Sequence, residues 1–285
     1  MKRLIYSSVI MLGMLLTITT SCKKESNTED DDLTSIEESA TAAETFFDAF
    51  ASLSSLSSEF DVLFSYSERG IQIQESSNTP KFNNTCGEIT ILPKNTSWPK
   101  TVTIDFGDGC TTDNINRKGK VIAVFTDRFK NPGAKVTVTF ENFEINGHKI
   151  EGTQVITNNG KNTAGNFNYS VEVKDAKITY NNKIFSFNSL NTIELINGSL
   201  TASPLDDVFS ITGSANGVDT KGRSFSVMIV KPLIKKIACK FIVSGSAEIT
   251  SGSGATKTLD YGSGDCDDKA MVTGAGLSKE ITLRK

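Results

Sequence analysis

The sequence contains one histidine and one tryptophan, and it has no Gly-x-Ser-x-Gly segment, phosphate loop or dinucleotide fingerprint. A Ser-His-Asp triad needs its histidine beside a nucleophile. The only candidate, His148, follows Asn146-Gly147, and we expect it to be an exposed turn residue. Closely spaced Cys-x-x-Cys ligands are absent as well, which disfavours a zinc site. We therefore expect neither a metal nor a cofactor.

Basic residues are not in excess, since 30 Lys and Arg stand against 33 Asp and Glu. Binding to nucleic acid depends on clustered Lys and Arg, so no nucleic-acid partner is expected. Two short basic segments occur, Arg117-Lys118-Gly119-Lys120 and Lys235-Lys236. We interpret both as solvated residues in turns.

Apolar runs long enough to cross a membrane are also missing. The longest, Leu4–Ile18, would span about 22 Å as a helix, short of the roughly 30 Å hydrocarbon core. After Lys2 and Arg3, this length is typical of a signal peptide. Cys22 directly follows three small residues, as in a bacterial lipobox, although Thr19 stands where Leu or Val is usual. We predict a lipoprotein signal peptide over 1–21 and a lipid anchor on Cys22 that holds the protein in a membrane. An ordinary cleaved signal with a chance cysteine is the alternative.

Residues 22–33 contain almost no apolar side chain and include the acidic run Glu29–Asp32, so we expect a flexible tether there. An acidic run shortly after an acylated cysteine resembles lipoproteins of the Bacteroidota that are exported to the cell surface. That resemblance implies a lipid-anchored location in the outer membrane, facing outward. A plain spacer is the alternative.

A helical segment is expected over 34–70. Thr34 with Glu37, or Ser35 with Glu38, can form a capping box at its start. Apolar residues then recur at steps of three and four, on a face that we expect to pack on a sheet. They are Phe46, Phe50, Leu53, Leu56, Phe60 and Leu63. Five serines between positions 52 and 58 weaken the middle, so one helix and two shorter helices remain equally open.

From 86 to 285 the apolar pattern has a period of two, as in Val102, Ile104 and Phe106, which is typical of half-buried strands. Hairpin turns are predicted at Asn146-Gly147, Asn197-Gly198 and Asn216-Gly217, with Asn181-Asn182 as a weaker case. We predict a mainly all-β protein with a short N-terminal helical segment. Its antiparallel meander would form a curved sheet, a sandwich or an open barrel.

Two segments of this β domain are alike. One runs from Cys86 to Asp105-Phe106-Gly107-Asp108-Gly109-Cys110, and the other from Cys239 to Asp260-Tyr261-Gly262-Ser263-Gly264-Asp265-Cys266. In each, a cysteine is expected to open a strand and a second to follow an Asp-aromatic-Gly-x-Gly turn. Four cysteines allow three pairings. The repeat favours the disulfides Cys86–Cys110 and Cys239–Cys266, each closing a local hairpin, and export permits such bonds.

These motifs also resemble a family of Bacteroidota lipoproteins. The likeness rests on the first Asp-aromatic-Gly run, on Arg117–Lys120, on the stretch from Glu151 to Asn158 and on the second run through Asp267. It covers nearly all of residues 86 to 285. The resemblance implies a β fold and an envelope address, and it brings no catalytic residue.

Carboxylates are the remaining chemical candidates. Asp105 with Asp108, or a pair among Asp265, Asp267 and Asp268, has the residue types needed for glycoside hydrolysis. Asp beside Gly is also ordinary turn chemistry, and we favour that interpretation.

Two further candidates are weaker. Asp108, Asp113 and Asn114 could offer calcium ligands, but the loop lacks the pattern of an EF-hand. Trp98 could stack on a sugar, although a packing role is more usual for a lone tryptophan.

We therefore assign no catalytic residue and expect a lipid-anchored surface module that binds a glycan or an envelope protein. A hydrolase that uses an Asp pair is one alternative. A fibre subunit completed by a neighbour's strand is another.

Overall fold

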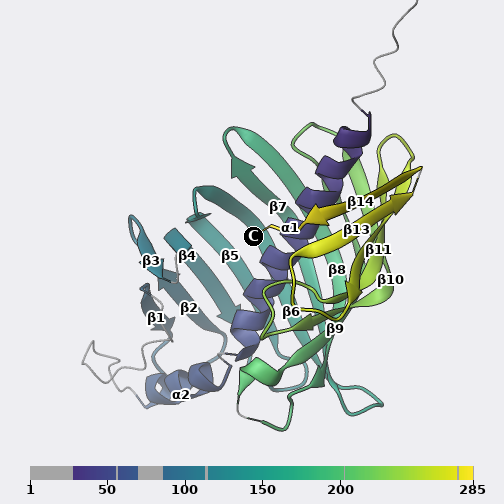
Figure 1. The fold of residues 1–285 in the computed structure, drawn as a ribbon. Helices are drawn as coiled ribbons and strands as arrows, with labels where there is room; N and C mark the ends of the chain where they lie inside the picture. Colours follow the sequence, from purple (N-terminus) through teal and green to yellow (C-terminus); the bar gives the residue numbers. More distant parts are fainter. Residues whose placement is uncertain are drawn as a thin grey trace, which may run out of the picture.

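The computed structural model describes residues 28–55, 57–69, 86–112, 115–201, 203–274 and 276–284. It shows one 14-stranded antiparallel sheet in the order β1-β2-β4-β5-β6-β7-β8-β9-β10-β11-β12-β13-β14, with β3 pairing beside this path to β4. β1 and β14 stand at opposite ends, so the sheet is open. It curves around the long helix α1 (Figure 1). The antiparallel meander is confirmed, and of the three shapes left open the protein has the curved sheet.

The strand bounds follow the period-two segments of the sequence. They are β1 (Glu88–Leu92), β2 (Lys100–Asp105), β3 (Cys110–Thr112), β4 (Ile115–Phe125), β5 (Lys135–Ile145), β6 (His148–Lys161), β7 (Phe167–Tyr180), β8 (Lys183–Asn197), β9 (Val208–Val218), β10 (Ser224–Lys236), β11 (Ser244–Ser251), β12 (Thr256–Ser263), β13 (Lys269–Gly274) and β14 (Leu277–Thr282). The helices are α1 (Thr28–Ser55), α2 (Ser57–Glu68) and the short η1 (Pro204–Asp206).

The helical region differs from expectation at its start. α1 begins at Thr28, so the last part of the segment expected to be a tether is helical. Acidic residues are favoured in the first turn of a helix by its partial positive charge, and the run Glu29–Asp32 suits that position. α1 ends at Ser55 and α2 begins at Ser57, so of the two alternatives left open by the sequence the protein has two helices. Cys22 and the predicted signal peptide lie outside the described residues.

The predicted apolar face of the helices packs on the concave face of the sheet, as expected. Phe50 is fully buried, and its ring centroid lies 5.2 Å from that of Tyr169 and 5.6 Å from that of Phe209. Phe46 stacks on Phe187, and on α2 Phe60 packs against Phe125 in β4. Leu56 lies outside the described residues. The helices and the inner sheet face therefore share one continuous core.

Two of the four predicted hairpin turns are confirmed. Asn146-Gly147 joins β5 to β6 and Asn181-Asn182 joins β7 to β8, with positive φ at all four residues. The prediction at Asn197-Gly198 is wrong, because the chain passes through η1 before β9 begins.

Asn216-Gly217 is also not a turn, since it lies inside β9. A Cβ on Gly217 would collide with the backbone carbonyl oxygen of Ser186 on the neighbouring β8, and it would also come within 2.8 Å of the Phe225 ring. Glycine is therefore needed at this position for close packing between strands, and not for a positive φ.

Candidate functional site

The four described cysteines form two pairs with their sulfur atoms at bonding distance. Cys86–Cys110 joins the segment before β1 to the start of β3, with a Cα–Cα distance of 5.9 Å. Cys239–Cys266 joins the loop after β10 to the loop after β12, with a Cα–Cα distance of 5.2 Å. These are the pairs that the repeat favours, and each closes a hairpin near one end of the sheet. Cys239 itself lies in a loop and does not open a strand.

Removing the second pair should destabilise the protein. For the variant with both Cys239→Ala and Cys266→Ala, we expect the free energy of unfolding to fall by about 3 kcal/mol, because the unfolded chain regains the entropy of a closed loop. Urea unfolding followed by circular dichroism measures this. Reductant should shift the midpoint of the wild type further than that of the variant, which retains only one pair. A variant as stable as the oxidised wild type would contradict the prediction.

The first Asp-aromatic-Gly-x-Gly run makes the expected turn, at Gly107-Asp108, whereas the second continues β12 as far as Ser263. β2 and β3 both pair with β4, and the first run lies between them. The second lies at the end of β12, where its register with β11 shifts. In both, the glycine donates its amide to the aspartate two residues earlier, with N–O distances of 2.9 Å for Gly107 to Asp105 and 2.8 Å for Gly262 to Asp260. The motif therefore builds a bulge-like break near each end of the sheet.

Two of the candidate carboxylates, Asp105 and Asp267, are engaged in local structure. The amide of Gly107, followed by Lys120 at 3.3 Å, holds the pKa of Asp105 below its usual range. Asp267 accepts a hydrogen bond from the amide of Lys269. Asp105 and Asp108 border an open depression that also contains Glu144. Lys118 pairs with Glu144 at 2.9 Å there. Asp113 and Asn114, the other candidate calcium ligands, lie outside the described residues.

The two rare aromatic residues have packing partners. His148 is the first residue of β6, it is half-buried, and its ring stacks on that of Tyr180 with centroids 4.2 Å apart. The prediction that His148 is an exposed turn residue is therefore wrong. Trp98 packs edge-on against Phe64 of α2, with centroids 5.1 Å apart. That contact agrees with the packing role preferred for this tryptophan.

Neither basic segment lies in a turn, although the side chains of Lys118 and Lys120 are 43% and 39% exposed and are therefore solvated as predicted. Arg117–Lys120 lies in β4, and Lys235-Lys236 ends β10. Alternation along β10 turns Lys235 into the core, where its side chain is 3% exposed and its Nζ lies 3.0 Å from Oε2 of Glu44 on α1. Nζ also donates to the carbonyl of Lys240, and Oε1 of Glu44 accepts the amide of Ile242 at 2.6 Å.

This ion pair joins α1 to the sheet, and sequence reasoning missed it. A signal was present, because Lys235 shares the inward face of β10 with the buried Leu233, two positions earlier. Glu44 likewise lies on the helix face that carries Ala40 and Phe47. Neither residue could be paired with the other from sequence, since 191 positions separate them.

A second polar contact fixes the first turns of α1 to the β9–β10 hairpin. Ser35 donates to Oδ2 of Asp219 at 2.6 Å, and Nε of Arg223 donates to the same oxygen at 2.9 Å. Burial opposes ionisation of Asp219, but these hydrogen bonds outweigh it and hold its pKa below the usual range. Glu38 accepts the amide of Thr220 at 3.0 Å. Ser35 and Glu38 therefore bind the hairpin, in place of the capping box expected from the sequence.

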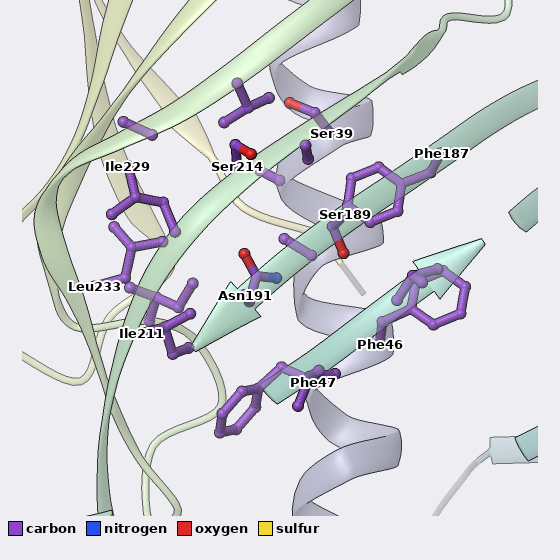
Figure 2. Close-up of a pocket in the computed structure, with 18 of the residues that line it drawn as sticks. Ser39, Phe46, Phe47, Phe187, Ser189, Asn191, Ile211, Ser214, Ile229 and Leu233 are labelled. Atoms are coloured by element: carbon purple, nitrogen blue, oxygen red, sulfur yellow. The ribbon is translucent and has the colours of Figure 1, made fainter. Parts of the chain in front are cut away.

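A cavity of about 60 Å³ lies between α1 and the inner face of strands β6 to β12. Its walls are mostly aliphatic and aromatic. Figure 2 shows Ser189 and Asn191 on one strand, with Phe46 and Phe47 on the helix side and Ile229 and Leu233 opposite.

Two buried polar atoms at this cavity have no hydrogen-bond partner within the described part of the chain. They are Oε1 of Gln154 and Oγ of Ser189. The other end of the Gln154 amide is held, since Nε2 donates to the carbonyl of Phe46 at 2.8 Å. Buried polar atoms are normally paired, so these two mark the cavity as a place for a hydrogen-bonding guest.

No helix in the described ranges is sufficiently long and apolar to cross a membrane. Among the same residues, no three His, Cys, Asp or Glu side chains are grouped as metal ligands. The cavity under α1, with its two unpartnered polar atoms, is the candidate functional site. No family model, no curated protein and no solved structure matches this chain.

Proposed function

We propose that this protein is a lipid-anchored module of the bacterial outer membrane that faces outward and acts by binding a ligand or partner. The observation that carries the anchor is the lipobox-like sequence ending at Cys22, after a short apolar segment. Thr28, where α1 begins, follows Cys22 by six positions. Six residues reach at most about 20 Å, so a lipid on Cys22 would hold the first turn of α1 close to the membrane surface.

The bonds between α1 and the β9–β10 hairpin extend this argument to the sheet. Because Ser35 and Glu38 fix the first turns of the helix to Asp219 and Thr220, the same rim of the sheet would face the membrane. Most of the sheet would then project away from the membrane, available to a partner.

The carboxylate contacts favour binding over hydrolysis. A glycosidase needs one carboxyl group that donates a proton and a second that acts as base or nucleophile. Asp105 instead accepts a backbone amide and faces Lys120, which stabilise its ionised form, and Asp267 also accepts a backbone amide. These contacts support structural roles for both residues.

Open strands at both ends of the sheet favour the fibre subunit as a second candidate. A neighbour's strand could add to β14, whose outer edge has no partner strand in the sheet order. β14 carries the exposed residues Lys279 and Glu280, and charged side chains on an edge strand discourage such pairing. We therefore prefer the binding module.

The anchor is tested with the variant Cys22→Ser. We expect the wild type, expressed in a bacterium with lipoprotein export, to partition into the detergent phase of Triton X-114, and Cys22→Ser to move to the aqueous phase. The variant lacking Cys239 and Cys266 is the control, since it loses other cysteines and should stay in the detergent phase. Cys22→Ser in the detergent phase would refute the anchor.

The binding role is tested with the same proteins, carrying a C-terminal tag. Wild-type protein captured from gently solubilised native membranes should retain a stoichiometric glycan or envelope protein in intact form. Recovery of a cleaved glycan, produced by wild type but not by Asp105→Asn, would replace this role by hydrolysis. Recovery of the protein alone would count against binding.

A further inference from the structure

We propose that the cavity under α1 binds the aliphatic chain of an amphiphile with a hydroxyl or amide end, and that the N-terminal half of α1 is its movable cover. The inference rests on the proposed binding role and adds a ligand for this cavity, separate from a glycan or envelope protein bound on the exposed sheet. Three features carry it: the composition of the walls, the two unpartnered polar atoms and the uneven attachment of α1.

The walls suit a hydrocarbon. On the side away from the helix they come from the inner faces of β9 to β12, with Ile211, Ile229, Leu233, Ile249 and Leu259 among the contributors. A sugar placed here would leave many hydroxyl groups without partners, at a large desolvation cost. A chain with a single polar end would not, so the apolar walls select against a glycan at this site.

The polar end of the ligand would bind at the two unpartnered atoms of Gln154 and Ser189. Nε2 of Gln154 is already bonded to the Phe46 carbonyl, so the amide is oriented and its Oε1 remains as a fixed acceptor. Oγ of Ser189 can donate or accept. A hydroxyl or amide that donates to Gln154 and accepts from Ser189 would satisfy both atoms at once. Figure 2 shows the Ser189 side chain beside Asn191, which offers a further polar contact.

The present volume limits what fits without movement. A water molecule has a share of about 30 Å³ in the liquid, and an engineered cavity of about 150 Å³ binds benzene. The observed 60 Å³ therefore holds about two water molecules or the end of a chain. A longer chain requires that the cover move.

The attachment of α1 indicates which part can move. Its C-terminal half is held by large aromatic contacts, since Phe46 stacks on Phe187 and both Phe47 and Phe50 pack on Phe209. Over the cavity the helix presents only Ser39, Ala40 and Ala43, apart from Phe46 and Phe47.

The N-terminal half is held by smaller contacts, namely the hydrogen bonds of Ser35 and Glu38 at the rim, that of Thr41 to the carbonyl of Arg284 at 3.3 Å, and buried residues without aromatic rings, Leu33, Ile36 and Ala42 among them. Tilting this half outward about Glu44 would extend the cavity along the aliphatic faces of β9 to β12. It would leave the aromatic contacts of the C-terminal half in place.

The test uses the purified full chain and a fluorescent chain probe, 11-(dansylamino)undecanoic acid. We expect saturable binding by the wild type and displacement of the probe by 1-decanol. Ser189→Val replaces the hydroxyl by two methyl groups that occupy part of the cavity, and it should weaken probe binding at least tenfold. Thr192→Val is the matched control on the opposite face of β8. This variant should bind the probe with the same affinity as the wild type.

Ala43→Val fills the cavity from the helix side and provides a second variant if Ser189→Val folds poorly, as judged by its thermal midpoint. It too should weaken binding. Absence of saturable binding by the wild type would overturn the proposal, as would unchanged affinity in both filled variants. Displacement by dansylamide but not by 1-decanol would show that the dye alone binds, which also overturns it. Phase partition of Cys22→Ser is independent of these results, so failure of this site is distinguishable from failure of the anchor.

Discussion

Replacing Lys235 with methionine is expected to lower the free energy of unfolding by about 3–5 kcal/mol. The side chain of Glu44 is 1% exposed and would lose the ammonium group that lies 3.0 Å away. The amide of Ile242 would still donate to Oε1 of Glu44, but the ammonium group of Lys235 would be missing from Oε2. Urea unfolding at pH 7, followed by far-ultraviolet circular dichroism, measures the loss.

The control for this variant is one position away. Lys236→Met removes a lysine from the opposite face of β10, where Nζ donates to the carbonyl of Gly264. The expected cost there is about 1 kcal/mol, the value of one hydrogen bond. Adding Glu44→Leu to Lys235→Met should recover most of the lost stability, because the buried carboxylate that Lys235 balances is then removed as well. Equal losses for Lys235→Met and Lys236→Met would show that the buried pair does not hold α1 on the sheet.

Phe50→Ala is expected to cost about 3–5 kcal/mol, because it removes a fully buried ring from the middle of the helix–sheet interface. The ring lies edge-on to both Tyr169 and Phe209, so the truncation would leave a cavity between α1 and two strands. For a domain of this size, such a loss corresponds to a fall of roughly 10 °C in the thermal midpoint. Calorimetry and urea unfolding both measure it.

Val62→Ala on α2 is the comparison for the aromatic variant. Val62 is 46% exposed, and surface substitutions of this kind usually change stability by about 0.5 kcal/mol or less. If Phe50→Ala lowered the free energy of unfolding no more than Val62→Ala, the packing of α1 against Tyr169 and Phe209 would be contradicted.

Local patterns anticipated the elements well. Alternating apolar residues predicted the strands, because successive side chains of a strand point to opposite faces. Asn146-Gly147 and Asn181-Asn182 predicted hairpins, because these residues tolerate the positive φ that such turns need. The same reasoning failed at Asn216-Gly217, where the backbone of the neighbouring strand β8 and the Phe225 ring leave no room for a side chain. A residue type that serves two purposes cannot be assigned from its own segment.

The candidate site was much less accessible to sequence reasoning. Alternation with Leu233 marks Lys235 and not Lys236 as the inward residue of β10, but its partner Glu44 lies 191 positions away and only the folded structure brings the two together. The unpartnered atoms of Gln154 and Ser189 become a pair of interest only because strands β6 and β8 curve around one helix. Nothing within either segment marks them.

The sequence by itself determined the antiparallel meander, the helical start, its apolar face and the cysteine pairs that the structure brings together, whereas the division of that start into two helices came from the structure. These depend on dihedral preferences and on side-chain spacing over a few residues, or on a repeat visible in the chain. Only the tertiary structure decided that the sheet stays open and curves, that Glu44 and Lys235 meet, and that a cavity remains under α1. Those outcomes depend on contacts between residues more than a hundred positions apart, for which local propensity carries no information.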